Sequence, residues 1–190
     1  MTFNELDKHA IEWNQIANGH RSLEERINTQ IDQCNEEMCK EFFYWLGEWN
    51  KFNSKHTEDE IKTEILDGFA DSRFVFAEFL NLEHSLGFYE HTNNYFFKLF
   101  NNVKNCALDT FGTYELHEAY RRVIESNFSK FVKVELMTKA QAIFEAGLIS
   151  GRFQCDCVPE LNNGYWVFRD SNGKIRKPTT FKPVDLSDLI

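Results

Sequence analysis

Residues 57–80 read TEDEIKTEILDGFADSRFVFAEFL, and this stretch decides how the chain folds. Thr57 followed three residues later by Glu60 is a capping box, the arrangement that satisfies the first backbone N–H groups of a helix. Apolar residues then recur at helical spacing, namely Ile61, Ile65, Phe69, Val75, Phe76, Phe79 and Leu80. The stretch therefore predicts a long helix that begins after Thr57 and ends near Gly87.

The same predicted helix carries a row of carboxylates. Glu64, Asp67 and Asp71 stand at i, i+3 and i+7, which places all three on one side of a helix within two turns. Like charges placed so repel one another unless something neutralises them. The neighbouring Gly68 and Ala70 are small and leave room for an approaching group. The row is either a solvated helix face or a ligand site.

A second long helix is predicted upstream, from about Leu23 to Phe52. Ser22 and Glu25 form its capping box, and its apolar residues recur at three- or four-residue steps, as Ile27, Ile31, Cys34, Met38, Phe42, Trp45 and Trp49. Residues 53–56 interrupt the pattern, so the connection to the next helix is short and favours antiparallel packing.

Carboxylates also share one face of this upstream helix. Glu37, Glu41 and Glu48 stand at i, i+4 and i+11, close to whole numbers of turns. If the two helices pack antiparallel, their acidic faces meet. A cage of carboxylate oxygens between helices suits Mg²⁺ or Mn²⁺, hard ions that also accompany nucleoside phosphates.

Helices are predicted for most of the remaining chain and a short β element for its end. The helical segments run from Asn4 to about Ala17, from Tyr89 to Val103, from Tyr114 to Phe131, and from Thr138 to Gly147. Runs 165–169 and 174–176 flank an Asn172-Gly173 pair, which is a hairpin signal. We therefore expect a mainly α fold, with a helical bundle over residues 1–150 and a dependent hairpin and tail arm over 151–190.

Composition narrows the possible functions. The chain has 190 residues and a formal charge of −9, which argues against an ordinary nucleic-acid binder that neutralises phosphates with a basic surface. Five cysteines form no framework-like spacing, and the pair Cys155 and Cys157 has no second pair to complete a zinc site. No signal-like stretch and no membrane-length apolar run is seen, so we expect a cytoplasmic protein that binds no membrane.

Three stretches resemble the all-α nucleoside triphosphate pyrophosphatases, the superfamily of MazG-like proteins, dimeric dUTPases and phosphoribosyl-ATP pyrophosphatases. EILDGFADSRFV (residues 64–75) is similar to the ExxD helix of that family. ESNFSKF (125–131) and GKIRKPTTFKPVDLS (173–187) are similar to the SNxSK motif and the tail of its phage members. The resemblance implies an all-α bundle, a homodimer or higher homo-oligomer, and, for a phage protein, the host cytoplasm.

One hallmark of the family departs from its pattern here. The family's first metal-binding helix carries EExxE, whereas this chain has Glu36 and Glu37 followed by Lys40 in the last position and Glu41 one residue later. Other registers pair Glu41 with Tyr44, or Trp45 with Glu48. Which carboxylates of the first helix hold metal therefore stays open.

The resemblance also implies an activity, the hydrolysis of a (d)NTP to (d)NMP and pyrophosphate with Mg²⁺ or Mn²⁺. The implied metal ligands are Glu41, Glu48, Glu64, Asp67 and Asp71, the first four being catalytic. The implied substrate-binding residues are Asn127, Lys130 and Lys177, with Lys174 and Arg176 closing the tail over the phosphates. The alternative is a non-catalytic acidic protein that mimics nucleic acid toward a basic partner.

Overall fold

A computed structural model describes residues 1–51, 53–87 and 95–190 of the chain. The chain forms two compact units, which are described separately. The first comprises Met1–Glu12, His20–Ile124 and Asp185–Ile190, and the second comprises Trp13–Gly19 and Glu125–Val184. Phe52 and the first six residues of the segment expected to be helical over 89–103 lie outside the described residues.

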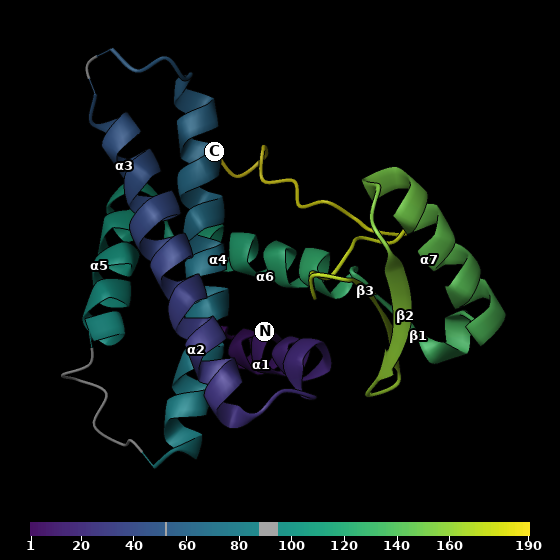
Figure 1. The fold of residues 1–190 in the computed structure, drawn as a ribbon. Coiled ribbons are helices and arrows are strands. Elements are labelled where there is room, and N and C mark those ends of the chain that lie inside the picture. Colours follow the sequence, from purple (N-terminus) through teal and green to yellow (C-terminus); the bar gives the residue numbers. More distant parts are fainter. Residues whose placement is uncertain (52, 88–94) are drawn as a thin grey trace. The chain divides into compact units, whose positions relative to one another are not determined.

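Two antiparallel helical columns form the centre of the first unit (Figure 1). One column is continuous through α2 (Leu23–Cys34), η1 (Asn35–Phe42) and α3 (Phe43–Trp49), and the other is α4 (Glu58–Ser85). The two predicted capping boxes, at Ser22 and Thr57, are both formed. The prediction of one regular α-helix over the first column is wrong in its middle, because η1 is a π-helix.

Helix α4 also packs on aromatic side chains of α5 (Tyr95–Thr110), which contacts η1 as well. The Phe76 ring of α4 stacks on Phe100, with 4.5 Å between centroids, and the Phe79 ring meets Phe96 edge-on at 5.1 Å. These rings are buried, so α5 fixes α4 by apolar packing that lies outside the row of Glu64, Asp67 and Asp71.

The first unit also takes in α6 (Thr113–Phe128) as far as Ile124 and α1 (Phe3–Asn18) as far as Glu12. Asp7 ties them to α4, because it accepts two hydrogen bonds from Arg73, at 3.0 and 2.8 Å, and one from the Tyr120 hydroxyl at 2.9 Å. Helix α6 ends earlier than the predicted Phe131, which instead begins strand β1 (Phe131–Lys133).

The second unit contains a three-stranded antiparallel sheet in the order β1-β3-β2, formed with β2 (Cys157–Asn162) and β3 (Tyr165–Asp170). Its tight turn is Asn163-Gly164, with φ of 46° and 80°. Two successive residues with positive φ make the turn that suits hairpins. The chain also reverses at the expected Asn172-Gly173 turn, where Arg169 and Ile175 form an antiparallel bridge and the backbone N–H of Arg176 donates to the carbonyl of Phe168 at 2.8 Å. The expected second run, 174–176, forms this single bridge and no strand of the sheet.

One face of this sheet is covered by α7 (Lys139–Phe153), which the short η3 (Val134–Leu136) precedes. The shared core consists of Val132, Ala142, Ala146, Ile149, Trp166 and Phe168. The expected helix end at Gly147 is wrong, because Ile149 continues the apolar spacing of Ala142 and Ala146 and keeps the helix on the sheet. It ends instead at Gln154, which has left-handed backbone at φ 51°.

The described residues are thus mainly helical, with one small antiparallel sheet. Among those residues, no helix combines the length and the apolar character that a membrane crossing demands.

Candidate metal centre

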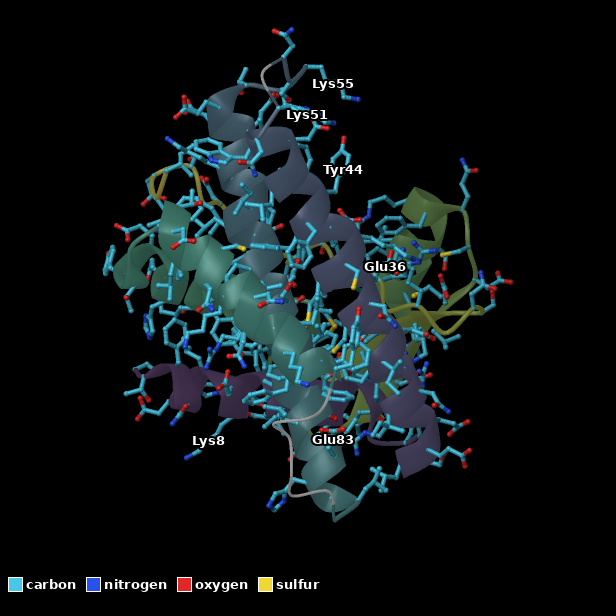
Figure 2. The ribbon with its side chains drawn as sticks, turned by 90° about the vertical axis from the view of Figure 1, so that its left-hand side faces the viewer. Lys8, Glu36, Tyr44, Lys51, Lys55 and Glu83 are labelled. Atoms are coloured by element: carbon cyan, nitrogen blue, oxygen red, sulfur yellow. The ribbon has the colours of Figure 1, made fainter. Side chains whose placement is uncertain are left out.

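The facing acidic sides of the two columns line one cleft of about 260 Å³ in the first unit. Its lining consists of Glu36, Glu37, Glu41, Trp45, Glu64, Asp67, Gly68 and Asp71. Figure 2 labels Glu36 on the first column, where it lies further from the turn between the columns than Tyr44 does. The cleft therefore brings together four residues expected as ligands, Glu41, Glu64, Asp67 and Asp71, with Glu37 of the predicted acidic face and with Glu36, which was not on that face.

Gly68 lets the two columns approach closely at the centre of the cleft. A Cβ at this position would lie 3.4 Å from Phe42 Cα, at the short limit of ordinary van der Waals contact, and 3.6 Å from its Cβ. Phe42 and Met38 are fully buried and fix η1 on α4. Because Asp67 adjoins the crossing, its carboxylate is held beside the opposite wall.

The π-helix explains how glutamates with the wrong α-helical spacing reach one cleft. In an α-helix Glu36 and Glu41, five residues apart, point about 140° away from each other. A π-helix closes its hydrogen bonds from i to i+5 and so absorbs one extra residue. Its wider turn brings residues five apart close to one side. The residue that separates EEMCKE from EExxE is thus accommodated by η1, and Glu36, Glu37 and Glu41 all line the cleft.

Inside the cleft, the charged form of Asp67 is disfavoured. Burial, and then the negative charge of Glu64, raise the pKa of Asp67 to about 6. Within the described part of the chain, no Lys, Arg or His forms an ion pair with Asp67, Glu64, Glu36 or Glu41. The protein thus holds like charges together at this point, an arrangement that a bound cation would relieve.

The donors of the cleft fit a hard divalent cation in kind. Every acidic lining group is a carboxylate, and the lining includes no His or Cys, which matches the oxygen ligands that Mg²⁺ and Mn²⁺ prefer. In their present rotamers, no three His, Cys, Asp or Glu side chains of the described residues are grouped so that they could hold an ion. The carboxylates share a cleft without yet converging on one point.

Glu48, the remaining expected ligand, does not line the cleft. Its buried carboxylate forms an ion pair with Lys51 and accepts a hydrogen bond from the Ser54 hydroxyl at 2.8 Å. These two hydrogen bonds hold the pKa of Glu48 below its ordinary value. Glu48 therefore stabilises the C-terminal end of the first column through Lys51 and Ser54. For Glu36 and Glu37, the sequence feature that indicated a place in the site was the EE pair of the imperfect EExxE motif.

The expected substrate-binding residues all belong to the second unit. Lys130 donates to the side-chain oxygen of Asn127 at 2.5 Å, and its ammonium lies 5.7 Å from the centre of the Trp13 ring. Lys177 stands over the Phe181 ring at 4.4 Å. Asn127 and Lys130 are thus neighbours on one turn, as their spacing indicated, and Lys177 lies on the tail.

The tail is fastened within the second unit. Thr179 donates its backbone N–H and its hydroxyl to the buried Glu145 carboxylate, at 2.5 and 3.0 Å. Arg176, expected to close over a substrate, forms an ion pair with Asp170, at 2.6 Å. Lys174 contributes its backbone, with its N–H bound to Asp170 at 2.9 Å. These contacts make the tail part of this unit's fold.

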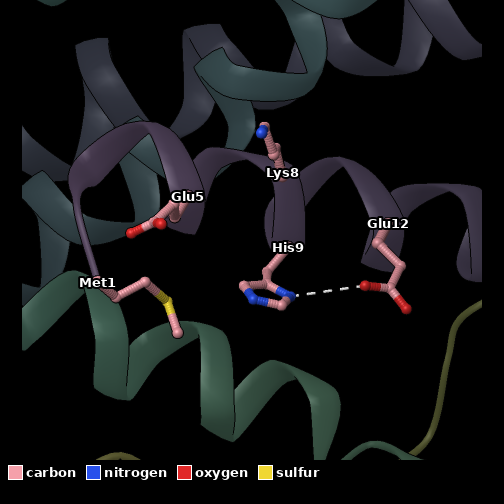
Figure 3. A pocket seen from close by; sticks show the side chains of 5 residues that line it. All are labelled: Met1, Glu5, Lys8, His9 and Glu12. Atoms are coloured by element: carbon pink, nitrogen blue, oxygen red, sulfur yellow. Dashed lines mark ion pairs between the residues drawn. The ribbon is translucent and has the colours of Figure 1, made fainter.

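The cysteine pair and a hollow beside α1 are weaker candidates for a metal or ligand site. Cys155 and Cys157 are free thiols, and burial followed by the neighbouring Cys155 raises the pKa of Cys157 to about 11, so it is a poor metal ligand at neutral pH. Figure 3 shows a hollow beside α1 lined by Met1, Glu5, Lys8, His9 and Glu12. His9 and Glu12 pair there at 3.5 Å, but both are exposed.

Comparisons of the chain with protein-family models, with curated proteins and with solved structures found no match in any of the three. The carboxylate cleft and the motifs of the sequence are therefore the features that indicate a function.

Proposed function

We propose that this chain is a divalent-metal-dependent nucleoside triphosphate pyrophosphohydrolase, which converts a (d)NTP to the (d)NMP and pyrophosphate. The observation that carries the proposal is the cleft in which six carboxylates from two packed helical columns face one another. The resemblance of residues 64–75 to the ExxD helix supports the same reading.

The residues that would hold Mg²⁺ or Mn²⁺ are the carboxylates of the cleft, Glu36, Glu37, Glu41, Glu64, Asp67 and Asp71. A bound ion of this kind supplies charge neutralisation to a triphosphate and lowers the pKa of a water molecule. To bind it, the long glutamate side chains of η1 rotate toward Asp67, which the close contact at Gly68 keeps in place. This rotation costs little because Glu36 and Glu41 are exposed.

The size of the cleft favours the charged end of a nucleotide. Its volume of about 260 Å³ is below the range of roughly 300–1,000 Å³ typical of pockets that enclose a whole small ligand. The cleft therefore takes the phosphates, and the sugar and base extend beyond it. Trp45 offers an apolar ring among the lining carboxylates, and base or sugar can pack on it.

The reaction balances with water as the only co-substrate. The water oxygen forms a bond to the α-phosphorus, the bond from that phosphorus to the bridging oxygen of the β-phosphate breaks, and pyrophosphate leaves with the electron pair. A carboxylate of the cleft accepts the proton of the attacking water.

Asn127, Lys130 and Lys177 belong to the proposal as residues that recognise the nucleotide. Lysines serve this role as point charges toward phosphate, and an amide such as that of Asn127 hydrogen-bonds sugar or base. The present pairing of Lys130 with Asn127 gives each a partner in the free protein.

Charge segregation favours a second candidate function. The first unit carries 24 Asp and Glu against 12 Lys and Arg, a net charge of −12, whereas the second carries 6 against 9, a net charge of +3. A surface this acidic suits a protein that occupies the nucleic-acid site of a basic partner. Such binding falls steeply with salt and is indifferent to single carboxylate changes in the cleft.

The deciding experiment measures pyrophosphate release from a panel of NTPs and dNTPs with Mg²⁺ or Mn²⁺. The wild type is compared with Glu64→Gln and Asp67→Asn. We expect release that depends on metal, with a loss of at least a hundredfold in both variants. The matched control is Asp59→Asn, an exposed carboxylate at the start of α4 outside the cleft, which leaves the rate unchanged.

Isothermal titration with Mn²⁺ in the absence of nucleotide gives an independent reading of the cleft. Saturable binding that disappears in Asp67→Asn supports the metal centre even if the right substrate is missing from the panel. No binding and no release, with a folded protein, would reject the enzyme and favour the acidic binding protein.

A further inference from the structure

A second pocket of the first unit, of about 410 Å³, lies among helices α1, α4, α5 and α6. Each helix contributes one apolar side chain to its lining, namely Phe3, Phe69, Leu108 and Leu116. The volume falls within the range of roughly 300–1,000 Å³ that encloses a small organic molecule. The pocket shares no lining residue with the acidic cleft, so a ligand here is independent of the proposed metal and nucleotide.

The apolar walls of this pocket are held in place by packing. Phe69 and Leu116 are buried. The Phe3 ring is fixed from two sides, because it meets the His117 ring edge-on at 5.0 Å between centroids and stacks on the Tyr120 ring at 6.2 Å. A preformed apolar pocket with a few polar groups is typical of small-molecule sites, and aromatic walls favour a ligand that is itself aromatic.

The charge that lines the pocket is opposite in sign to the charge of the unit around it. Arg73 and Lys104 are both lining residues, and no Asp or Glu of the described residues lines the pocket. The first unit as a whole carries −12. Because nearby charges dominate over distant ones that water and salt screen, the pocket itself favours an anion.

The two cationic residues differ, because one of them is already neutralised. Arg73 donates two hydrogen bonds to Asp7, at 3.0 and 2.8 Å, and its guanidinium lies 4.3 Å from the centre of the Phe3 ring. Lys104 forms no ion pair within the described part of the chain. Its flexible side chain can bring the ammonium to a ligand. One uncompensated positive charge matches a ligand with one negative charge.

We propose that this pocket binds a small aromatic carboxylate. The aromatic ring packs against Phe3 and Phe69, and the carboxylate pairs with the Lys104 ammonium. The Thr113 hydroxyl, which also belongs to the lining, donates a hydrogen bond to the same carboxylate. A carboxylate fits better than a phosphate monoester, which carries between one and two negative charges at neutral pH, because Arg73 remains committed to Asp7.

The test titrates the full chain with 2-naphthoate by calorimetry, beside 2-naphthamide, which has the same rings and no charge. We expect saturable binding of 2-naphthoate with a dissociation constant below about 1 mM, and binding of 2-naphthamide that is at least tenfold weaker. Lys104→Met keeps an apolar side chain and removes the charge. We expect this variant to bind 2-naphthoate at least tenfold more weakly and 2-naphthamide as the wild type does.

The matched control is Lys98→Met. Lys98 is an exposed lysine of the same helix that does not line the pocket, so its loss changes the net charge equally. The affinity for 2-naphthoate stays unchanged, and circular dichroism checks that both variants are folded.

Three results would overturn the proposal. One is the absence of 2-naphthoate binding, and another is equal affinity for the acid and the amide. The third is an equal effect of the two lysine variants on 2-naphthoate, since a loss in both would show attraction by overall charge and a loss in neither would place the anion away from Lys104.

Discussion

Gly68 of α4 lies directly against Phe42 of η1, and only 3.4 Å separates Phe42 Cα from the place where a Cβ of residue 68 would stand. This contact brings the two carboxylate walls together. Because the neighbour is backbone rather than the end of a flexible side chain, the columns must move apart to admit a larger residue.

Gly68→Val is therefore expected to lower the free energy of unfolding by about 2 kcal/mol through overpacking. Gly47→Ala, at an exposed helical site with nothing within 4 Å, is expected to raise it by about 0.5–1 kcal/mol. Urea denaturation of the two variants beside the wild type measures both changes. An increase for Gly68→Val would contradict the close contact at the cleft.

Removal of Lys40 tests the role of the π-helix. The deletion converts EEMCKE to EEMCE, which has the spacing of EExxE. A regular α-helix can then replace the π-helix η1 and still point the glutamates into the cleft. We expect the variant to remain folded and to bind Mn²⁺ within about tenfold of the wild type, as measured by titration calorimetry.

The control for this deletion is the removal of Asp32, an exposed residue in the regular α2 helix. There the chain has no extra residue to give up, so the deletion rotates one part of the first column against the other. It is expected to destabilise the first unit severely. Equal damage from the two deletions would argue that η1 does not hold an inserted residue.

The raised pKa of Asp67 predicts a pH dependence of stability in metal-free protein. Its pKa is about 6 in the folded chain, above the value near 4 expected after unfolding. The folded state binds more protons between these values, so the stability present below pH 4 is lost as pH rises through 6. Asp67→Asn removes this loss.

Denaturation in a chelator checks the expectation at two pH values. At pH 7.5 Asp67→Asn should be more stable than the wild type by about 1–3 kcal/mol, and near pH 4 the difference should disappear. Saturating Mn²⁺ should reverse the order at pH 7.5, since only the wild type gains from binding. A variant less stable than the wild type at both pH values would show that the carboxylate is not under strain.

The Glu48→Gln variant tests whether Glu48 stabilises the end of the first column without binding metal in the cleft. The substitution weakens the pairing with Lys51 and Ser54, so the thermal midpoint falls. The affinity for Mn²⁺ stays the same because Glu48 does not line the cleft. A thermal scan and a metal titration of one sample report the two results, and a large loss of affinity would restore Glu48 as a ligand.

Local signals in the sequence predicted much of the fold. The capping boxes predicted at Ser22 and Thr57 are both formed, because each depends on residues three positions apart. Tertiary context decided the rest. Gly147 did not end α7, since its neighbours lie on the sheet, and the strand paired with β3 is β2 because the Asn163-Gly164 turn holds them.

The candidate site was predictable on one wall and less so on the other. Regular α-helical spacing placed Glu64, Asp67 and Asp71 together, and all three line the cleft. On the first column the same rule excluded Glu36, because the π-helix that redirects it depends on how Met38 and Phe42 pack against α4. Periodicity in a sequence does not reveal where a helix widens.

The second unit joins residues that are far apart in the chain. The Trp13 ring stacks on Phe131 at 5.1 Å, its indole N–H donates to the carbonyl of Asn127, and Arg169 donates to the carbonyl of Ala17, 152 positions away. During synthesis, residues 13–19 leave the ribosome long before these partners exist. Trp13, Ile16 and Ala17 of this segment can therefore be buried only once these partners emerge, and completion of this unit follows release of almost the whole chain.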